Sequence, residues 1–172
     1  ISLRIGETLQ AKHEFEAFMG QFGIKVQAYR ADNHPFGKPT FIRDCETQNQ
    51  TLTFSGVGAH FQNGVAKRAL QTNTNWARAM MMHQLIHWPE QFNPELWPFA
   101  LEHATHIWNS TPKQGSPFAP WEHLTKTRRM GPSPLEQTRV WGCPVYVLNP
   151  KLQDGKKLPK WTMRSRQGVY LG

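Results

Sequence analysis

Cysteine and long apolar runs are both scarce in this 172-residue sequence, and each shortage excludes a class of protein. The two cysteines, Cys45 and Cys143, lie in different segments and form no Cys-x-x-Cys or Cys/His pattern. This excludes a disulfide framework and a zinc knuckle, so we expect buried thiols and no zinc. No apolar run approaches the ~20 residues that a membrane-spanning helix requires, and no membrane partner is expected.

Acidic residues are also few. The chain has 20 Lys and Arg against 12 Asp and Glu, a formal net charge of +8. Residues 139–172 alone hold seven Lys and Arg and one acid. Basic proteins bind phosphate backbones by releasing condensed counterions, so this balance favours a nucleic-acid partner over a merely soluble basic protein.

The length suits one medium domain, or one domain with a small appendage. The chain opens on Ile1 without a methionine and has no signal peptide, and it stops at Gly172 in a strand-like stretch. We expect a fragment of a longer polyprotein that acts in the nucleus or the cytoplasm.

Hydrophobic periodicity predicts a helix over residues 7–22, ended by Gly23, and a strand over 24–30 that delivers Asp32 to a strand end. Further along, it predicts a short helix over 40–48, a strand over 51–54, and helices over 64–87 and 95–108. A proline-rich connection follows over 111–134, with a helical turn around 121–124, and then β-like stretches over 140–148 and 167–171.

The predicted helices each have an apolar side, and we expect that of the first and of the long helix to face a core. In the first helix this side consists of Leu9, Phe15, Phe18, Met19 and Phe22. In the long helix it consists of Val65, Ala66, Ala69, Leu70, Trp76, Ala77, Met80 and Met81. The opposite side of the long helix is polar and basic.

Five stretches of the sequence resemble those of a known protein family. They occur in that family's order and are spread along nearly the whole chain. They are Tyr29-Arg-Ala-Asp32-Asn33, Gly56-Val-Gly-Ala-His-Phe-Gln-Asn63-Gly64-Val-Ala, Trp108-Asn-Ser-Thr-Pro112, Ser116-Pro-Phe-Ala-Pro-Trp121-Glu122 and Val140-Trp-Gly-Cys143-Pro-Val-Tyr146. The chain resembles a copia-type LTR-retrotransposon integrase on these stretches.

The resemblance implies an α/β fold: a ribonuclease H-like integrase core, truncated at its N-terminal strands, followed by a small β-rich segment. Residues 1–112 would form the partial core, residues 113–138 a proline-rich connection, and residues 139–172 the small basic β-rich C-terminal segment, itself truncated. The resemblance also implies DNA as the partner and DNA integration as the process, and a homo-oligomer is left open.

Three carboxylates hold two Mg²⁺ or Mn²⁺ ions in that family, where the ions activate a nucleophile and stabilise the leaving oxygen. Asp32 matches the second carboxylate, and the first would lie upstream of this chain. The third position, 35 residues after Asp32, is Lys67, and a protonated amine has no lone pair for a metal. We therefore expect Asp32 to be the surviving metal ligand, metal binding to be weak or absent, and this chain to be catalytically inactive.

The same resemblance places a helix along DNA, and from it we expect DNA contacts from Asn63, Lys67, Arg68, Gln71 and Arg78. A solvated helix face is the alternative for these charges. Two further alternatives concern the whole chain: a non-enzymatic nucleic-acid-binding or interaction module derived from an integrase, and a working nuclease that recruits Asp44 or Glu46 as a substitute ligand.

The paired histidines and the aromatic residues of the C-terminal segment each leave two interpretations open. His83 with His87, and His103 with His106, have spacings that metal ligands can use, but neither pair has a third ligand nearby and packing is favoured. Tyr146, Trp161 and Tyr170 lie among the basic residues of the C-terminal segment. They could stack on bases, but we expect them mainly to fill the interior of a small barrel.

Overall fold

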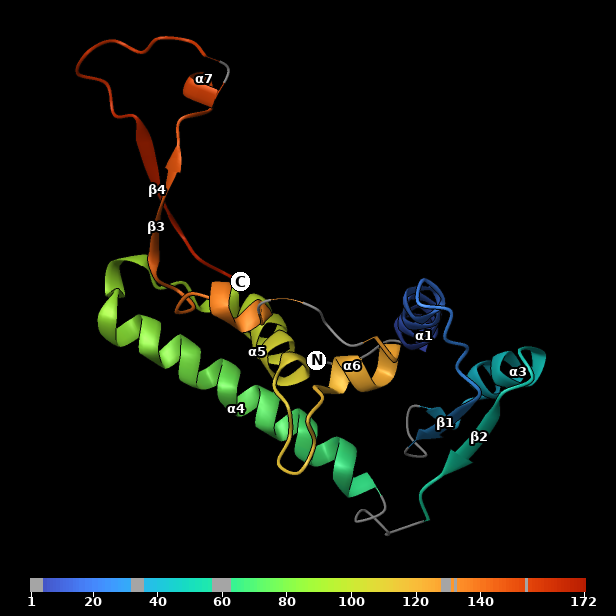
Figure 1. Ribbon diagram of the computed structural model, residues 1–172. Helices are drawn as coiled ribbons and strands as arrows, with labels where there is room; N and C mark the ends of the chain where they lie inside the picture. The colour runs from blue at the N-terminus through green and yellow to red at the C-terminus, as the bar shows by residue number, and fades with distance from the viewer. Residues whose placement is uncertain (1–4, 32–35, 57–62, 128–130, 132, 154) are drawn as a thin grey trace. The chain divides into compact units, whose positions relative to one another are not determined.

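A computed structural model of the chain describes residues 5–31, 36–56, 63–127, 131, 133–153 and 155–172 (Figure 1). The architecture is mixed α/β, with helices and, among these residues, two small sheets. The chain forms two compact units, Ile1–Ala69 and Leu70–Gly172, whereas the division expected at residues 112 and 138 stays a prediction. In the described part of the chain, no helix is both long and apolar enough to cross a membrane.

In the first unit, helix α1 (Ile5–Gly20) ends in a turn at Gly23. Gly23 has a φ of +70°, a left-handed conformation that glycine adopts without steric cost. Its N–H donates to the Gly20 carbonyl at 3.0 Å, and the Ile24 N–H donates to the Met19 carbonyl at 3.1 Å. These bonds satisfy carbonyls that the helix end leaves without partners. The predicted helix and its glycine stop are confirmed.

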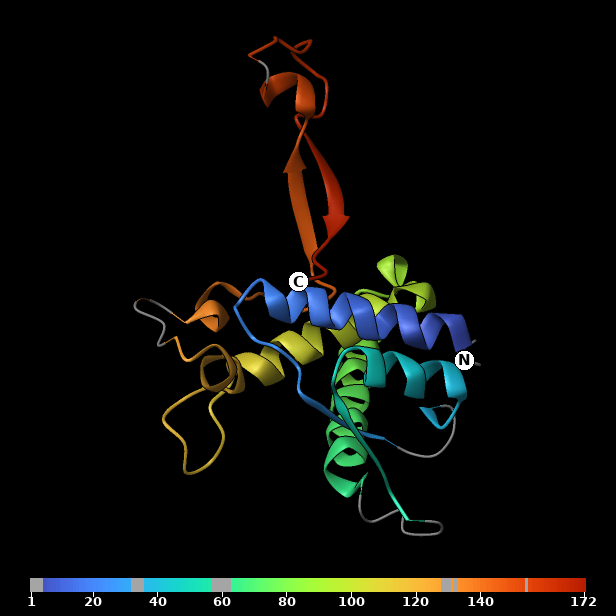
Figure 2. The ribbon, with the colours of Figure 1, turned by 90° about the vertical axis from the view of Figure 1, so that its right-hand side faces the viewer.

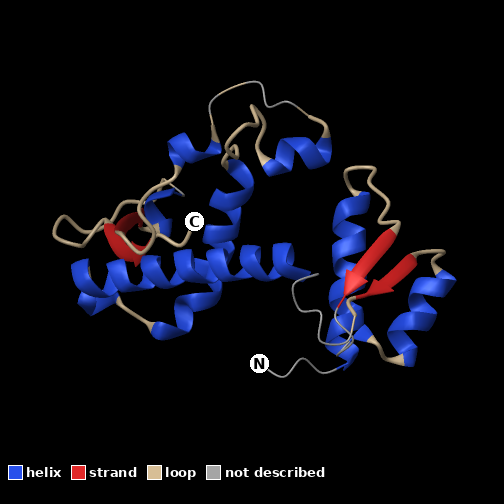
Figure 3. Ribbon diagram, turned by 90° about the horizontal axis from the view of Figure 1, so that it is seen from below, coloured by secondary structure: helices blue, strands red, loops and turns tan. Residues whose placement is uncertain are grey.

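Strands β1 (Ala28–Ala31) and β2 (Thr51–Phe54) pair in parallel, with helix α3 (Pro39–Thr47) in the connection between them. Parallel strands require such a crossover, because a tight turn cannot join them. Figure 3 shows the two strands as adjacent red arrows that point the same way. The prediction for β2 is confirmed, while β1 begins later than the predicted residue 24.

The buried side of α1 is largely polar, contrary to the sequence prediction. Met19 is 2% exposed, but its buried companions on α1 are Thr8 and Lys12. Three of the five apolar side chains predicted to face the core are instead 42–49% exposed: Phe15, Phe18 and Phe22. Lys12 can be buried because Asp44 of α3 forms an ion pair with it at 2.6 Å.

Helix α4 (Gly64–His87) has the predicted bounds. Ala77 of α4 joins Ala100, Ala104 and Trp141 in the core of the second unit. Partly buried side chains pack against this cluster: Trp76, Met80, Met81, Leu96, Leu101 and Leu171. The apolar side is therefore confirmed for the later part of α4.

The prediction is wrong for the start of α4, because Val65 is 88% exposed and Leu70 is 65% exposed. Gln84, which the apolar pattern did not predict to be buried, is fully buried instead. Its Nε2 donates to the carbonyl of Gln91 at 3.3 Å.

Helix α5 (Trp97–Ser110) follows the short helices η2 (Pro89–Gln91) and η3 (Pro94–Leu96). The Asn93 side chain accepts a hydrogen bond from the Glu95 N–H at 2.9 Å and so caps η3. The predicted helix over 95–108 is confirmed. Helix α6 (Pro120–Thr125) confirms the helical turn expected around residues 121–124, and η4 (Pro134–Gln137) lies farther along the same connection.

Strands β3 (Pro144–Leu148) and β4 (Ser165–Val169) form an antiparallel ribbon, with the short helix α7 (Pro150–Gln153) in their connection. Figure 2 shows the two strands running in opposite directions, with α7 beyond their far end. The root of the ribbon is anchored: the Gly142 N–H donates to the Tyr170 carbonyl at 2.8 Å, and the Trp141 Nε1–H donates to the Leu171 carbonyl at 3.1 Å.

Only glycine suits position 142 at this root. Its φ is +80°, and a Cβ atom there would lie 2.8 Å from the Cγ of the buried Gln84. Any larger residue would combine an unfavourable backbone conformation with a clash against a side chain that has no room to move.

The expected small barrel does not form among the described residues. Tyr146 is 72% exposed and Trp161 is 91% exposed, so the prediction that they fill an interior is wrong. The third aromatic, Tyr170, is partly buried, with its ring 5.9 Å from that of His103. A two-stranded ribbon has no enclosed interior, and its aromatic side chains stay in solvent unless a neighbour covers them.

Candidate nucleic-acid interface

The carboxyl ends of β1 and β2 lie at one edge of the parallel pair, which is where α/β proteins commonly place functional side chains. β1 ends at Ala31, which is 8% exposed, and the next residue, Asp32, lies outside the described residues. The Ser55 N–H, just after β2, donates to the Ala31 carbonyl at 3.1 Å. Hydrogen bonding therefore fixes the backbone up to the residue before Asp32.

Asn63 connects this edge to the start of α4. Its Nδ2 donates to the Oγ of Ser55 at 3.4 Å, and Ser55 is only 5% exposed. Asn63 itself is half-buried and directly precedes Gly64, the first residue of α4. Part of its amide is thus engaged within the first unit, and its contact with DNA stays a prediction.

Helix α4 bears the other predicted DNA contacts, and all four are exposed: Lys67, Arg68, Gln71 and Arg78. We refer to these four residues as the α4 stripe. Lys67, Gln71 and Arg78 are separated by four and seven residues, spacings that keep side chains on one helix face. The 24-residue helix contains no Asp or Glu, so no acid on α4 itself offsets this positive charge.

Lys67 is the residue that departs from the resembling family. It lies exposed in the first turn of α4, and its alignment with a metal-binding glutamate stays a prediction from the sequence. Within the described residues, which leave out Asp32, no group of three His, Cys, Asp or Glu side chains is placed to hold a metal ion. A cationic helix face of this kind suits phosphate groups better than metal cations.

Asp44, the substitute ligand considered for a nuclease, is engaged elsewhere in the first unit. Its Oδ2 lies 2.6 Å from the Nζ of Lys12, and its Oδ1 lies 2.9 Å from the Nε2 of His13. Burial alone would raise the pKa of Asp44, but hydrogen bonds with Lys12 and His13 hold it below its usual value. Both oxygens already have cationic or hydrogen-bonding partners, so they are poorly suited to a metal.

The same ion pair belongs to a larger polar network that sequence reasoning missed. Glu16 lies 2.9 Å from the Lys12 Nζ and also accepts hydrogen bonds at 2.7 Å from the Tyr29 hydroxyl and the Gln50 side chain. Burial alone would lower the pKa of Lys12, but its bonds to Asp44 and Glu16 raise it. The network therefore joins α1, α3 and β1 through one buried cation.

The pKa values of Glu16 and Tyr29, two other members of the network, shift in opposite directions. Burial alone would raise the pKa of Glu16, but the bonds from Gln50, Lys12 and Tyr29 lower it. Burial and the hydrogen bond to Glu16 raise the pKa of Tyr29 well above its ordinary value. The carboxylates are stabilised as anions, and the phenol is stabilised as a neutral donor.

The two histidine pairs differ in environment. The rings of His83 and His87 are exposed, with centroids 4.2 Å apart, and Trp88 lies 5.6 Å from His83. His103 is 4% exposed, and burial together with the charge of His106 lowers its pKa. These ring contacts agree with the packing interpretation of both pairs.

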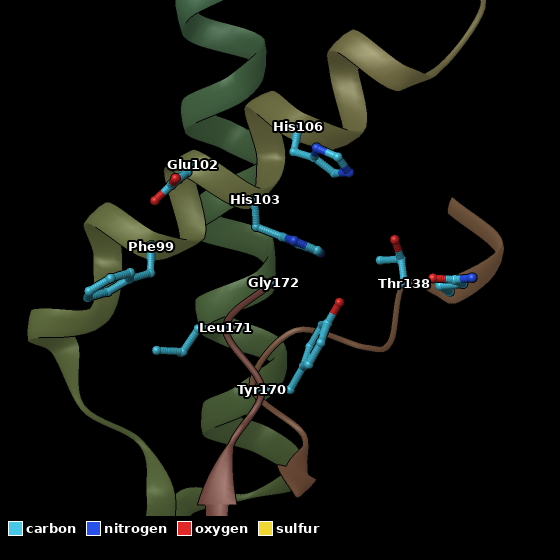
Figure 4. A pocket seen from close by; sticks show the side chains of 9 residues that line it. Phe99, Glu102, His103, His106, Thr138, Tyr170, Leu171 and Gly172 are labelled. Atoms are coloured by element: carbon cyan, nitrogen blue, oxygen red, sulfur yellow. The ribbon is translucent and has the colours of Figure 1, made fainter. Parts of the chain in front are cut away.

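An open pocket of about 640 Å³ lies beside His103 in the second unit (Figure 4). It is lined by α5, by η4 and the residue after it, and by the segment after β4. The side chains in this lining are Phe99, Glu102, His103, His106, Gln137, Thr138, Tyr170 and Leu171, with Gly172 at the edge. The sequence offered the spacing of His103 and His106 as a signal, but nothing in it linked α5 to Tyr170.

No family model matches the sequence, and no curated protein matches it. One solved structure resembles the chain: a chain in the cryo-electron microscopy structure of the simian T-cell lymphotropic virus intasome in complex with the PP2A regulatory subunit B56 gamma. The TM-score is 0.52 at 15% sequence identity, over 95% of this chain and 52% of the other.

At this identity the likeness concerns the fold alone. The chain shares its fold with about half the length of a chain in that intasome complex.

Proposed function

We propose that the chain is a fragment of a retrotransposon integrase, which binds DNA in a DNA-integration system and is catalytically inactive as it stands. The observation that carries this proposal is the structural likeness to a chain of a viral intasome over 95% of the present chain. An intasome is an assembly of integrase with DNA, so the likeness in fold is consistent with this class of protein. The DNA partner is proposed from the net charge of +8 and the exposed cations of the α4 stripe.

The finer assignment is a ribonuclease H-like core of the copia type. In support of it, two parallel strands share a carboxyl edge, Asp32 directly follows one of them, and α4 begins nearby at Gly64. The sequence stretches that resemble copia-type integrases include both of these positions. Assembly of several copies on DNA is part of the same proposal.

DNA would contact the α4 stripe. Its exposed cations lie on a helix without acidic residues, and each phosphate contact releases counterions from the duplex. The positive end of the helix dipole at Gly64 adds to the attraction for phosphate. Binding of this kind weakens steeply as salt is added.

Catalytic inactivity follows from the charge of Lys67. At an effective dielectric of about 20, two unit charges 4 Å apart interact by about 4 kcal/mol. A lysine in place of a glutamate therefore changes attraction for a metal ion into repulsion by several kcal/mol, and each ~1.4 kcal/mol is tenfold in rate or affinity. Asp32 alone cannot hold two ions in the geometry that phosphoryl transfer needs.

The DNA-binding part is tested by fluorescence anisotropy on a labelled 30-base-pair duplex. The variant Lys67→Glu/Arg68→Glu/Arg78→Glu reverses the charge of the stripe and is expected to weaken binding at least tenfold. The control Lys25→Glu/Arg43→Glu/Lys126→Glu makes the same charge change at three other exposed cations and should weaken binding much less. An equal loss in both variants would mean that net charge, rather than the stripe, binds DNA.

The catalytic part is tested by nicking and strand transfer on the same duplex with Mg²⁺ or Mn²⁺. We expect no product, and binding that depends neither on the metal nor on Asp32→Asn. Cleavage that disappears in Asp32→Asn would show an active nuclease and overturn the proposed inactivity.

A non-enzymatic binding module derived from an integrase is the second candidate. It is favoured by one observation, the exposed Lys67 at the position of the family's glutamate. Product from Lys67→Glu in a chain extended upstream to include the first carboxylate would assign the chain to a decayed enzyme, whereas continued silence of that extended variant favours the module.

A further inference from the structure

The far end of the β3–β4 ribbon exposes large side chains that proteins usually bury. Trp161 is 91% exposed, Met163 is 83% exposed and Tyr146 is 72% exposed. We refer to residues 146–166 as the ribbon tip. An aromatic side chain commonly buries 150–250 Å² on folding, so leaving Tyr146 and Trp161 in water, together with Met163, forgoes a large favourable contribution.

Both faces of the ribbon are open at this end. Tyr146 pairs with Gln167 on one face, and Val147 pairs with Arg166 on the other; all four are exposed. Toward the root the strands are half-buried instead. The exposure is therefore specific to the tip and does not extend along the whole ribbon.

The connection that bears Trp161 is organised by backbone hydrogen bonds. The Asn149 N–H donates to the Arg164 carbonyl at 2.8 Å, which closes the loop at its base. The Thr162 N–H donates to the Pro159 carbonyl at 3.0 Å, so Trp161 lies inside a turn. Trp161 therefore lies on a turn whose backbone is hydrogen-bonded, with its indole open to a ligand.

Charge identifies what can cover this apolar surface. The ribbon tip contains six basic residues and one acid: Lys151, Lys156, Lys157, Lys160, Arg164 and Arg166 against Asp154. A second copy of the tip would be repelled. The Nζ of Lys160 lies 5.5 Å from the centroid of the Trp161 ring, so a ligand that stacks on the indole would meet a cation at once.

We propose that the ribbon tip is a single-stranded nucleic-acid site, in which Trp161 stacks on an unpaired base and the surrounding lysines and arginines bind phosphates. Bases in a duplex present their edges in the grooves and keep their faces stacked on one another. An exposed indole can use its face only on a base that is unpaired. The inference rests on the proposed function in taking nucleic acid as the partner, but it uses no residue of the α4 stripe.

The test is binding of the full chain to a 20-nucleotide oligo-dT, followed by fluorescence anisotropy at fixed salt. Trp161→Ala is expected to weaken binding about tenfold, since stacking contributes roughly 1–3 kcal/mol per base. Trp161→Phe keeps a stacking face and should stay within about twofold of the parent. The matched control is Trp97→Ala, at a tryptophan of the same unit that is 47% exposed, which should leave binding unchanged.

A second arm separates this inference from the proposed function. Charge reversal of the α4 stripe should reduce duplex binding and largely preserve oligo-dT binding, and Trp161→Ala should do the opposite. If the stripe variant leaves duplex binding intact, the proposed function fails while the tip remains testable by Trp161→Ala. Comparison of oligo-dT with oligo-rU assigns DNA or RNA by whichever binds more tightly.

Two results would overturn the inference. One is an equal loss of oligo-dT binding in Trp161→Ala and Trp97→Ala. The other is complete competition by poly-L-glutamate at equal charge concentration, which would indicate an acidic protein as the occupant, because a polypeptide of this kind has no base to stack.

Discussion

The two small sheets are stabilised in different ways. The parallel pair β1–β2 lies beside two helices, and Lys12, Glu16 and Tyr29 tie it to α1 and α3 by side-chain bonds of 2.6–2.9 Å. The antiparallel ribbon β3–β4 is anchored at its root, where the buried Trp141 and the backbone of Gly142 hold the segment after β4. Parallel strands generally need cover on their faces, whereas an antiparallel ribbon can leave its faces in solvent.

This difference separates the residues that stabilise the fold from those that we propose to bind nucleic acid. In the first unit a buried charge requires its partners, so the loss of one partner leaves an uncompensated ion. In the second unit the apolar core around Trp141 and the hydrogen bonds of Trp141 and Gly142 lie at the root of the ribbon, which leaves the tip exposed to solvent. All seven tryptophans lie in the second unit, so tryptophan fluorescence reports on that unit and hydrogen exchange can follow the first.

The largest expected effect is at the root. Trp141→Ala removes a side chain that is 3% exposed in the core with Ala77, Ala100 and Ala104, and large-to-small changes of this kind cost about 3–5 kcal/mol. Urea unfolding followed by tryptophan fluorescence should show the loss. The control Trp161→Ala, at the tip, should change the unfolding free energy by less than about 0.5 kcal/mol. Similar losses for both would mean that the tip is packed in solution.

The next effect concerns the network of the first unit. Lys12→Met keeps the volume of the side chain but leaves Asp44 and Glu16 as unbalanced partly buried anions, at a cost of about 3 kcal/mol. Hydrogen exchange of α1 and α3, measured by mass spectrometry, should accelerate, while the exchange of α5 stays unchanged.

The triple variant Lys12→Met/Glu16→Gln/Asp44→Asn is the control for that loss. It removes all three charges together and should recover much of the stability, because no ion is left without a partner. If the single and triple variants exchange alike, Lys12 acts by packing and the charge pairing is immaterial.

Acid should weaken the first unit selectively. Hydrogen bonds lower the folded-state pKa of Glu16 and of Asp44. Near pH 4, where carboxyl groups ordinarily titrate, the unfolded chain therefore binds more protons than the folded chain. The stabilisation is complete above that range and is lost as the pH falls through the lowered folded-state values. Glu16→Gln/Asp44→Asn should flatten this acid dependence in the exchange of α1. A wild-type profile that is already flat would show that the network does not couple to folding.

The smallest effect is expected at the ribbon tip. Tyr146→Thr removes an aromatic ring that is 72% exposed but keeps a residue that favours strands. The unfolding free energy should change by less than about 0.5 kcal/mol. A loss above about 1 kcal/mol would mean that Tyr146 is buried against a neighbour, and would weaken the contrast between root and tip.

Much of the element order could be predicted from the sequence. The bounds of α4 and β2 follow from strong periodicity and from flanking turn residues, and the stop of α1 follows from Gly23. Local pattern sufficed in these cases because neighbours along the chain decide the conformation.

The packing partners could not be predicted in the same way. The burial of Lys12 depends on its partner Asp44, which lies 32 residues away, and no local pattern records that pairing. Gln84 is buried because Gly142, 58 positions later, approaches it closely. The aromatic residues of the C-terminal segment suggested an interior, but a two-stranded ribbon has none. For the candidate site, the sequence supplied the exposed stripe of α4, and its contact with DNA stays a prediction.

The connection between α7 and β4 has one more consequence. Residues 155–164 contain several lysines and form no regular helix or strand, so a brief digestion with trypsin should cut the chain there first. The two strands are paired over five residues from Pro144 to Leu148 and adjoin the anchored root, so a single cut should leave the fragments associated. An insertion in this loop should likewise leave the root of the ribbon folded, while it would disturb the proposed site around Trp161.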